Sequence, residues 1–403
     1  MGVPLQQTIT TETVISQAAR STRKPELDAL RGLFLIWMTL THLPTHVSDL
    51  VNAPFGYISS AEGFVFLSAL LVGRVYMRQA QKGNLGYRVT LRRRSLRIYI
   101  YQLIMLTLLF TFGAAVAVRG HHPALANLLN FYLGHRVVAI VTSVLLVYCP
   151  PLLDILPMYV IFLLLSPVLI GAAHRHGWRW LLAGSIAIWI LAQFHLRDAV
   201  HHVFVRVTHL PVPLQELGAF NLFAWQMVWL TGMWMGARSV TGPLPFAALP
   251  RWCNGVAVAL CVFFFGVRFD FWGHGLTQQS FGLLLDKWQE GPLRVLNVAA
   301  FMCLIYALRT PVRRLVTHKP LVTLGMASME VFCAHLVFVF IGLGLLNGQE
   351  TQLHGLYAFL LLLFTFIGLA IVAHLQVRRK YAQKEKALRT GAPVGNASWL
   401  EGS

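Results

Sequence analysis

Long, nearly uncharged apolar segments recur along this chain, and they restrict its fold more than any other feature. A membrane-spanning helix needs about 20 mostly apolar residues, and ten segments of this kind lie between residues 27 and 376. Only 12% of the 403 residues are charged, and the mean hydropathy is +0.62, whereas soluble domains carry about 25% charged residues. The sequence therefore excludes a water-soluble domain and a disordered chain, and it predicts an all-α, polytopic membrane helix bundle.

Ten apolar segments have the length and composition of transmembrane helices. An eleventh apolar run, residues 137–149, has only 13 residues and is followed by Pro150 and Pro151, so we interpret it as a re-entrant or interfacial segment. The ten predicted spans cover residues 27–45, 55–74, 96–118, 155–173, 178–196, 217–237, 253–269, 293–308, 321–346 and 353–376.

The positions of the basic residues predict how the bundle is oriented. If ten spans leave both termini inside, 25 of the 33 Lys and Arg residues fall in cytoplasmic segments and seven in outer loops. This bias follows the positive-inside rule, under which short cytoplasmic segments are rich in Lys and Arg. We therefore expect one transmembrane domain over 25–377, with the N-terminal tail 1–24 and the basic tail 378–403 both in the cytoplasm.

The net charge of +18 has a membrane explanation, so we expect no nucleic-acid partner. The positive charge lies between apolar segments, which is the pattern that sets the topology of membrane proteins. The five cysteines lie mostly within apolar runs and are interpreted as buried hydrophobic residues, not as disulfides or metal ligands. The first 20 residues lack the apolar core of a cleavable signal peptide.

The first predicted span carries three ionisable residues on one face. Arg31 and His42 are eleven positions apart, about three helical turns, and Asp28 precedes Arg31 by three positions. Such groups are costly inside a membrane and indicate a functional site by default. We expect Asp28 to pair with Arg31 near the cytoplasmic end, and His42 to lie near the outer end. A helix-end ion pair and a histidine bonded to a neighbouring helix are the structural alternatives.

The second predicted span places an acidic residue, Glu62, at a depth similar to that of His42. Glu62 lies seven residues into the span, about 10 Å below its outer edge. A buried glutamate is protonated or paired, so we predict that Glu62 pairs with His42. In such a pair the imidazole can take a proton from a hydroxyl group while the carboxylate orients it. We therefore predict His42 as a general base and Glu62 as its partner.

Two further segments supply candidate supporting residues. In the ninth span Ser328 and His335 fall on one face, and Glu330 points elsewhere; a polar contact between helices is the structural alternative. The outer segment before the eighth span carries Lys287 and Arg294 and can bind an anionic or sugar group. No two spans show the ligand spacing of a metal site, so we expect no metal.

The connection between the second and third predicted spans is strongly basic. Its sequence is QKGNLGYRVTLRRRSLR, and its centre is formed by Arg92, Arg93 and Arg94. One interpretation is contact with anionic lipid headgroups, which would also fix the topology. The other is a docking surface for an anionic cosubstrate from the cytosol.

Taken in order, several segments of the chain resemble the membrane acyltransferase-3 superfamily, and in particular its OpgC branch. The first span has arginine and histidine separated by ten residues, and the second span has an acidic residue. The resemblance extends from residue 24 to about 376. The segments that carry it are ELDALRGLFLIW (26–37), EGFVFLSALLVGRVY (62–76), RRSLRIYIYQL (93–103), LPMYVIFLLLSPVL (156–169), FNLFAWQMVWLTG (220–232), GPLRVLNVAAF (291–301) and MEVFCAHLVF (329–338).

The resemblance implies an acyltransferase of the bacterial cytoplasmic (inner) membrane. The OpgC branch is associated with succinylation of periplasmic glucans, with acyl-CoA on the cytoplasmic side and the glucan on the periplasmic side. Acyl-CoA, expected as succinyl-CoA, is then a cosubstrate, and no cofactor is expected. Arg31 and His42 match the arginine and histidine of the family, and Glu62 matches its second-span acidic residue. The wider superfamily often has an appended periplasmic hydrolase domain, which we do not expect here.

Two mechanisms and two other classes of function stay open. Direct transfer is favoured because no Ser-His-Asp motif or reactive cysteine is evident, but a covalent acyl-enzyme is the alternative. Polar stripes also line the paths of secondary transporters, although corresponding broken helices in two halves are not evident in the sequence. A membrane scaffold or lipid-binding protein would leave the ionisable residues within the spans unexplained.

Overall fold

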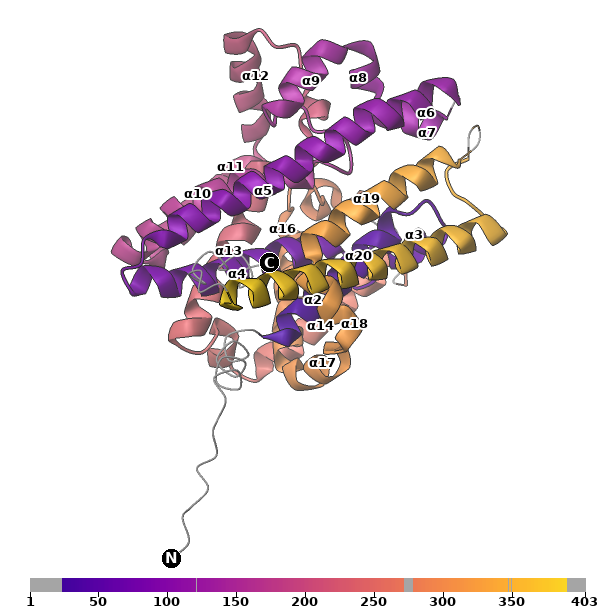
Figure 1. Cartoon of the computed structure of the whole chain (residues 1–403). Coiled ribbons are helices and arrows are strands. Elements are labelled where there is room, and N and C mark those ends of the chain that lie inside the picture. The colour runs from indigo at the N-terminus through magenta and orange to yellow at the C-terminus, as the bar shows by residue number, and fades with distance from the viewer. Residues whose placement is uncertain (1–23, 121, 272–277, 347, 349, 390–403) are drawn as a thin grey trace, which may run out of the picture.

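The protein folds as a bundle of helices (Figure 1). The computed structural model describes residues 24–389 except 121, 272–277, 347 and 349. Within these residues the only strand-like pairing is a single parallel bridge between Thr45 and Leu353. The all-α helical bundle expected from the sequence is confirmed. Most of the predicted N-terminal tail and residues 390–403 lie outside the described residues.

The helices follow one another from α2 at the start of the described chain to α20 at its end. The first half contains α2 (Pro25–His42), α3 (Val47–Val51), α4 (Ser60–Gln81), α5 (Gly86–Leu108), η1 (Leu109–Gly113), α6 (Ala114–Arg119), α7 (Pro123–Leu128), α8 (Asn130–Gly134), α9 (Arg136–Val144), α10 (Ile155–His176), α11 (Trp178–Gln193) and α12 (Leu196–Thr208). The second half contains η2 (Leu214–Leu217), α13 (Leu222–Thr241), η3 (Pro245–Ala248), α14 (Trp252–Arg268), α15 (Gln278–Phe281), η4 (Gly282–Leu285), α16 (Pro292–Ala307), α17 (Arg309–Val316), α18 (Lys319–Met326), α19 (Ser328–Gly344) and α20 (Gly355–Arg389).

Each of the ten ranges predicted as spans contains a helix, but fewer than ten helices qualify as spans by length and composition. Among the described residues four are long and apolar enough, and up to seven if each bent helix pair is one span. The helix α2 carries charges in its first turns, and α14 is only 17 residues long. The structure therefore supports a membrane helix bundle, while ten separate crossings and their direction stay predictions.

The ninth predicted span, 321–346, is not one continuous helix. It breaks at Ala327, where α18 and α19 meet at a bend of 90°. Similar bends of 79° and 84° separate α11 from α12 and α16 from α17. The apolar sequence runs on through the break at Ala327, so composition alone did not reveal it.

The basic strip is helical, which corrects its interpretation as a connecting segment. The helix α4 runs to Gln81, α5 begins at Gly86, and helical structure continues to Arg119 through the π-helical turn η1. Arginine is a good helix former, and the arginines therefore occupy the first turns of a long helix. The run interpreted as non-spanning contains only α9, a helix of nine residues that is too short to cross a membrane.

Close backbone contacts at glycines hold the centre of the bundle together. A Cβ atom added to Gly236 of α13 would lie 1.9 Å from the carbonyl oxygen of Leu70 in α4. A Cβ atom on Gly325 of α18 would lie 1.8 Å from the carbonyl oxygen of Asp28 in α2. Small residues of this kind let helices pack closely in membranes. The pairs α4–α13 and α2–α18 therefore form the rigid frame that carries the ionisable residues.

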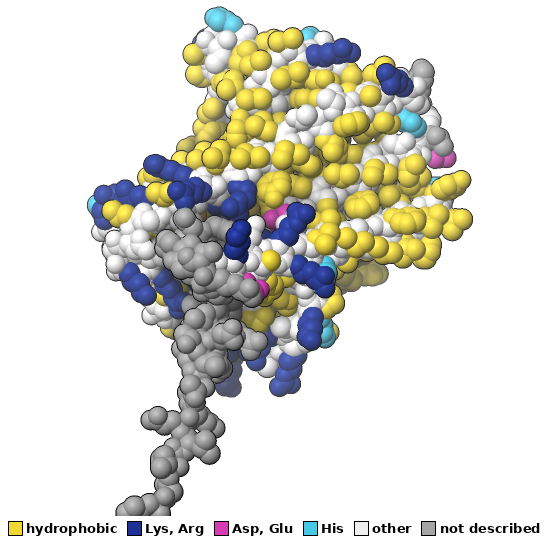
Figure 2. All heavy atoms as spheres, in the orientation of Figure 1, with side chains coloured by type: hydrophobic (Ala, Val, Ile, Leu, Met, Phe, Trp, Pro, Cys, Tyr) yellow, Lys and Arg dark blue, Asp and Glu magenta, His cyan; other side chains and the backbone are white. Residues whose placement is uncertain are grey.

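The outer surface is that of a membrane protein (Figure 2). Hydrophobic side chains cover most of the visible face, and Lys and Arg gather toward its lower and left margins, from the start of α5 to α17. Large apolar side chains such as Phe112, Val168 and Phe364 are more than half exposed. In water such a surface would be unstable, whereas a lipid bilayer solvates it.

Candidate active site

Two polar contacts join α2 to α19 along one seam. The guanidinium Nη2 of Arg31 donates to the hydroxyl of Ser328 at 2.5 Å. About three turns further along α2, Nδ1 of His42 lies 3.2 Å from Nε2 of His335. Arg31, Ser328 and His335 are buried, and His42 is half-buried. The predictions that Arg31 and His42 share one face, and that Ser328 and His335 share another, agree with this seam.

The hydrogen bonds of the two imidazoles determine which nitrogen of His42 is free. Nδ1 of His335 lies 2.5 Å from the carbonyl oxygen of Phe332, which can only accept, so this nitrogen donates. In a neutral ring Nε2 of His335 is then an acceptor, and Nδ1 of His42 donates to it. The lone pair of His42 is left on Nε2, which hydrogen-bonds to none of the described residues. The seam therefore holds the His42 imidazole with its unprotonated nitrogen facing away from His335.

Glu62 does not pair with His42, so that predicted contact is wrong. The helix α4 begins at Ser60 and not at residue 55, which places Glu62 in its first turn. There Glu62 accepts a hydrogen bond of 3.0 Å from the backbone N–H of Ser59 and another from the Ser59 hydroxyl, as a capping box. The orienting position expected for Glu62 is occupied by His335.

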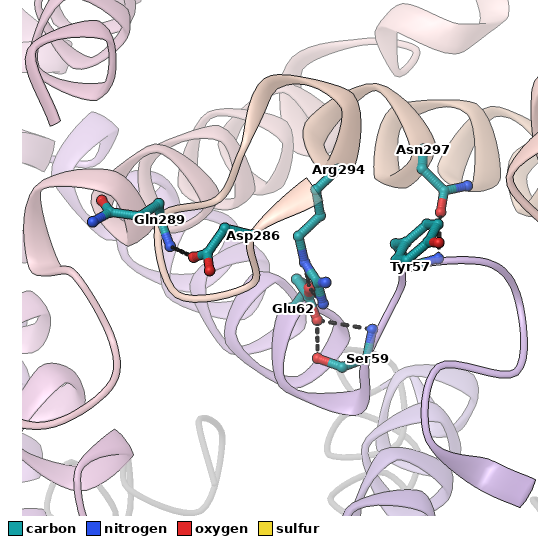
Figure 3. Close-up of polar contacts among 7 residues, drawn as sticks. All are labelled: Tyr57, Ser59, Glu62, Asp286, Gln289, Arg294 and Asn297. Carbon is teal, nitrogen blue, oxygen red and sulfur yellow. Dashed lines mark hydrogen bonds and ion pairs between the residues drawn. The ribbon is translucent and has the colours of Figure 1, made fainter. Parts of the chain in front are cut away.

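The partner of Glu62 is Arg294, from the first turn of α16 (Figure 3). Nε of Arg294 donates to Oε1 of Glu62 at 2.6 Å, and both side chains are almost fully buried. A buried charge is tolerable when it is paired and hydrogen-bonded. The first turns of α4 and α16, which are far apart in sequence, are thus joined by one ion pair.

Lys287 lies between the Glu62–Arg294 ion pair and His42 in its electrostatic interactions. Its positive charge is close enough to act on His42 of α2 and on Glu62 of α4. Burial lowers the pKa of Lys287, and the nearby Arg294 cation lowers it further, while the Glu62 carboxylate opposes this shift. Its Nζ lies 4.6 Å from the centre of the Trp288 ring. The predicted supporting residues Lys287, Arg294 and His335 therefore each interact with His42 or Glu62.

Near Arg31, at the other end of the seam between α2 and α19, only one of the three predicted donor-binding arginines of α5 is partly buried. Arg92 and Arg93 are exposed on α5, whereas Arg94 is half-buried, and its Nη1 is buried without a hydrogen-bond partner among the described residues. Arg94 and Arg31 both act electrostatically on the hydroxyl of Tyr159 in α10. These residues form a polar cluster with two cations inside the bundle.

Asp28 and Glu330, the other ionisable residues noted in the first and ninth predicted spans, occupy separate positions. Asp28 is buried on α2, and its pairing with Arg31 stays a prediction. Glu330 points away from the seam, as expected, and lies 3.7 Å from Nζ of Lys380. Among the described residues no group of three or more His, Cys, Asp or Glu side chains is placed to hold a metal ion.

Two residues of the site were missed in the sequence. Ser59 stands three positions before Glu62, a capping-box spacing that can be read directly and that predicts the start of α4. Tyr159 gives no local signal, because a tyrosine in an apolar helix is common and its neighbours come from α2 and α5.

A comparison with known protein families gives one match. The family model described as OpgC protein matches residues 23–380, which is nearly the whole chain. No curated protein and no solved structure matches the chain. The matched range includes every element of the seam, the ion pair and the cation cluster.

Proposed function

Because the chain belongs to the OpgC family, we propose that it is a membrane O-acyltransferase that moves an acyl group from cytoplasmic acyl-CoA to a hydroxyl group of a periplasmic glucan. The family indicates a membrane transferase that acts in glucan modification. The more specific parts of the proposal, a succinyl group, succinyl-CoA and the inner membrane of a bacterium, follow what the resemblance to the OpgC branch implies. The observation that carries the acyl-transfer step is the free Nε2 of His42, oriented by His335.

In the proposed step His42 is the general base. Its Nε2 takes the proton of the acceptor hydroxyl while the hydroxyl oxygen attacks the thioester carbonyl. A C–O bond forms, the C–S bond breaks, and the proton passes to the leaving thiolate, which gives an ester and free coenzyme A. The imidazolium that forms in between shares its Nδ1 proton with His335. Lys287, whose charge acts on His42, is assigned to offset the negative charge that develops on the carbonyl oxygen.

The donor is proposed to bind from the side of the Arg31–Arg94 cluster. Coenzyme A carries several phosphate charges, and guanidinium groups bind phosphate with paired hydrogen bonds. Arg94 offers a buried N–H without a partner among the described residues, whereas Arg92 and Arg93 offer only surface charge. Asp28 is assigned to hold Arg31 in position. Donor and acceptor would therefore meet along the seam between α2 and α19.

The deciding experiment is single-turnover acyl transfer with detergent-purified protein. We expect His42→Ala to slow transfer by about 10²–10⁴-fold, the usual effect of losing a general base, without weakening acyl-CoA binding. His46→Ala is a matched control because His46 forms another histidine pair, with His354, on an exposed surface. If His42→Ala transfers within about threefold of wild type, the base lies elsewhere.

One observation favours the alternative of a secondary transporter. Three helix pairs are bent by 79° to 90°, and broken helices are common where transporters bind substrates. Uptake of labelled glucan or of small anions into proteoliposomes, without any acyl-CoA, would support this alternative. Gene-dependent addition of an acyl mass to the glucan supports the acyltransferase instead.

A further inference from the structure

Glu290 carries a buried carboxyl group that has no role in the proposed step. The residue is 1% exposed, and neither of its carboxylate oxygens has a hydrogen-bond partner among the described residues. A buried polar group without a partner destabilises a protein, so most buried polar groups are paired. An exception of this kind needs an explanation, and a ligand that hydrogen-bonds the carboxyl group is one.

The backbone around Glu290 is held in an unfavourable conformation. Its φ angle is 47°, in the left-handed region that a glutamate rarely adopts. Two side chains of α11 fix it there: Trp189 donates to the carbonyl of Glu290 at 2.9 Å, and Gln193 donates to the carbonyl of Gln289 at 2.8 Å. The backbone N–H of Gln289 also donates to Asp286 at 2.7 Å (Figure 3). Strain that is maintained in this way is concentrated at functional sites.

The charges around Glu290 are those of the candidate active site. Its carboxyl group interacts with Glu62, Arg294, Lys287 and Asp286. Burial raises the pKa of Glu290 well above its ordinary value, and the negative charge of Glu62 raises it further. This shift favours the neutral carboxylic acid, which can both donate and accept a hydrogen bond.

We propose that Glu290 binds the acceptor by hydrogen-bonding the hydroxyl groups of a neutral sugar residue beside the hydroxyl that reacts. This inference rests on the proposed function, because it takes the acceptor to be a glucan. A sugar hydroxyl both donates and accepts, as a carboxylic acid does, so the two groups match. An anionic ligand fits less well, because Glu62 already neutralises Arg294.

The test is binding of a short, unmodified glucan oligosaccharide to the purified full-length protein in the absence of acyl-CoA. Glu290→Leu replaces the carboxyl group with an apolar side chain of similar size, and we expect it to weaken binding by about tenfold or more, as loss of hydrogen bonds in a buried site does. Glu290→Gln keeps a donor and an acceptor in the same place, so it should bind within about threefold of wild type. Glu216→Leu, in the outer turn η2, is the control and should bind as wild type does.

Melting temperature and donor affinity separate this role from a structural one. Because no described residue hydrogen-bonds the carboxyl, Glu290→Leu should keep or raise the melting temperature and leave acyl-CoA binding unchanged. Three results would overturn the inference: oligosaccharide binding by Glu290→Leu equal to wild type, a loss by Glu290→Gln as large as that of Glu290→Leu, or a lower melting temperature together with weaker donor binding. If Glu290→Leu weakens oligosaccharide binding but the wild type transfers no acyl group, the proposed reaction is wrong and the proposed role of Glu290 in binding is retained.

Discussion

At the residue scale, the backbone carbonyl of Phe332 in α19 determines which nitrogen of His42 in α2 carries the proton. It accepts the Nδ1 proton of His335, which makes Nε2 of His335 an acceptor for His42. The proton on His42 is thereby held at Nδ1, and the basic lone pair faces the other way. A carboxylate is the more familiar orienting group for a catalytic histidine, but Glu62 is already bound by Arg294 and Ser59.

We expect His335→Ala to slow acyl transfer by about 10–100-fold, less than loss of the base itself, because His42 would lose its fixed tautomer. The maximal rate should fall while the Michaelis constants of donor and acceptor change little. The measurement is steady-state and single-turnover kinetics on variants of equal melting temperature. A rate equal to that of wild type would mean that His335 does not orient His42 for the reaction.

The ion pair between Glu62 and Arg294 should behave as a buried pair. Removing one partner leaves the other charge buried alone, so Glu62→Gln should lower the free energy of unfolding by about 3–5 kcal/mol. Glu62→Gln combined with Arg294→Met should lose less than the sum of the single changes. Thermal or denaturant unfolding in detergent measures this double-mutant cycle. Additive losses would show that the two side chains do not interact.

Asp154 makes stability depend on pH at the start of α10. Burial raises the pKa of Asp154 from 3.8 to about 6, although the backbone N–H of Ala219 donates to it at 2.8 Å and opposes the shift. Between about pH 4 and 6 the folded carboxyl keeps a proton that the unfolded chain has lost, so stability falls as pH rises and is level above that window. Across that window the free energy of unfolding falls by about 3 kcal/mol at most.

Asp154→Asn should therefore unfold with a weaker pH dependence than wild type, because its amide is neutral throughout. Melting temperatures of both proteins between pH 4 and 8 provide the comparison, in which only the difference between the two curves is assigned to Asp154. A difference that grows above pH 6 would contradict the assignment.

At the element scale, the seam depends on how closely α2 approaches α18 and α19. Gly325 lies against the backbone of α2 at Asp28, one turn before Arg31. The bend at Ala327 then turns the chain so that α19 runs beside the far half of α2, with Ser328 opposite Arg31 and His335 opposite His42. A continuous ninth helix could not make both the glycine contact and the seam.

Gly325→Ala should push α2 away and lower the free energy of unfolding by about 1–3 kcal/mol, the usual cost of overpacking. Arg31 should be displaced from Ser328, so acyl-CoA affinity should fall as well. The control is Gly184→Ala in α11, where an added methyl group meets no atom within 4 Å. That variant should be neutral or slightly more stable, since alanine favours helices over glycine by up to about 1 kcal/mol. Equal unfolding curves for both variants would contradict the close packing.

At the scale of the whole molecule, charge and apolar surface predict how the bundle lies in the membrane. The exposed apolar side chains face lipid, and the arginines at the start of α5 mark the predicted cytoplasmic end. Asn84 lies between α4 and α5 at that end, and Arg136 begins α9 in the longest predicted outer segment; both are exposed. Their side chains are suitable positions for testing the orientation.

In a cysteine-free background, we expect Asn84→Cys to react with an impermeant maleimide only after the cytoplasmic side is exposed. Arg136→Cys should react in intact cells from which the outer membrane barrier has been removed. Labelling of Arg136→Cys only from the cytoplasm would contradict ten spans with both termini inside, and would make residues 137–149 part of an additional crossing.

The sequence by itself determined the class of the fold, the family and two of the faces that form the site. Apolar composition requires a membrane bundle whatever its packing, and helical periodicity alone places Arg31 with His42 and Ser328 with His335. These properties are local, since each depends on residues within one or two helices.

Only the tertiary structure decided which of these groups contact one another. Glu62 and His42 were paired by estimating depth along two ideal, continuous helices, but α4 begins five residues later than that estimate assumed. Its partner, Arg294, comes from a helix 232 positions away in the chain. The bend at Ala327 and the left-handed backbone of Glu290 likewise depend on contacts from distant helices. A buried ionisable group needs a partner. Any helix that packs beside it can supply that partner, and the local sequence does not determine which helix packs there.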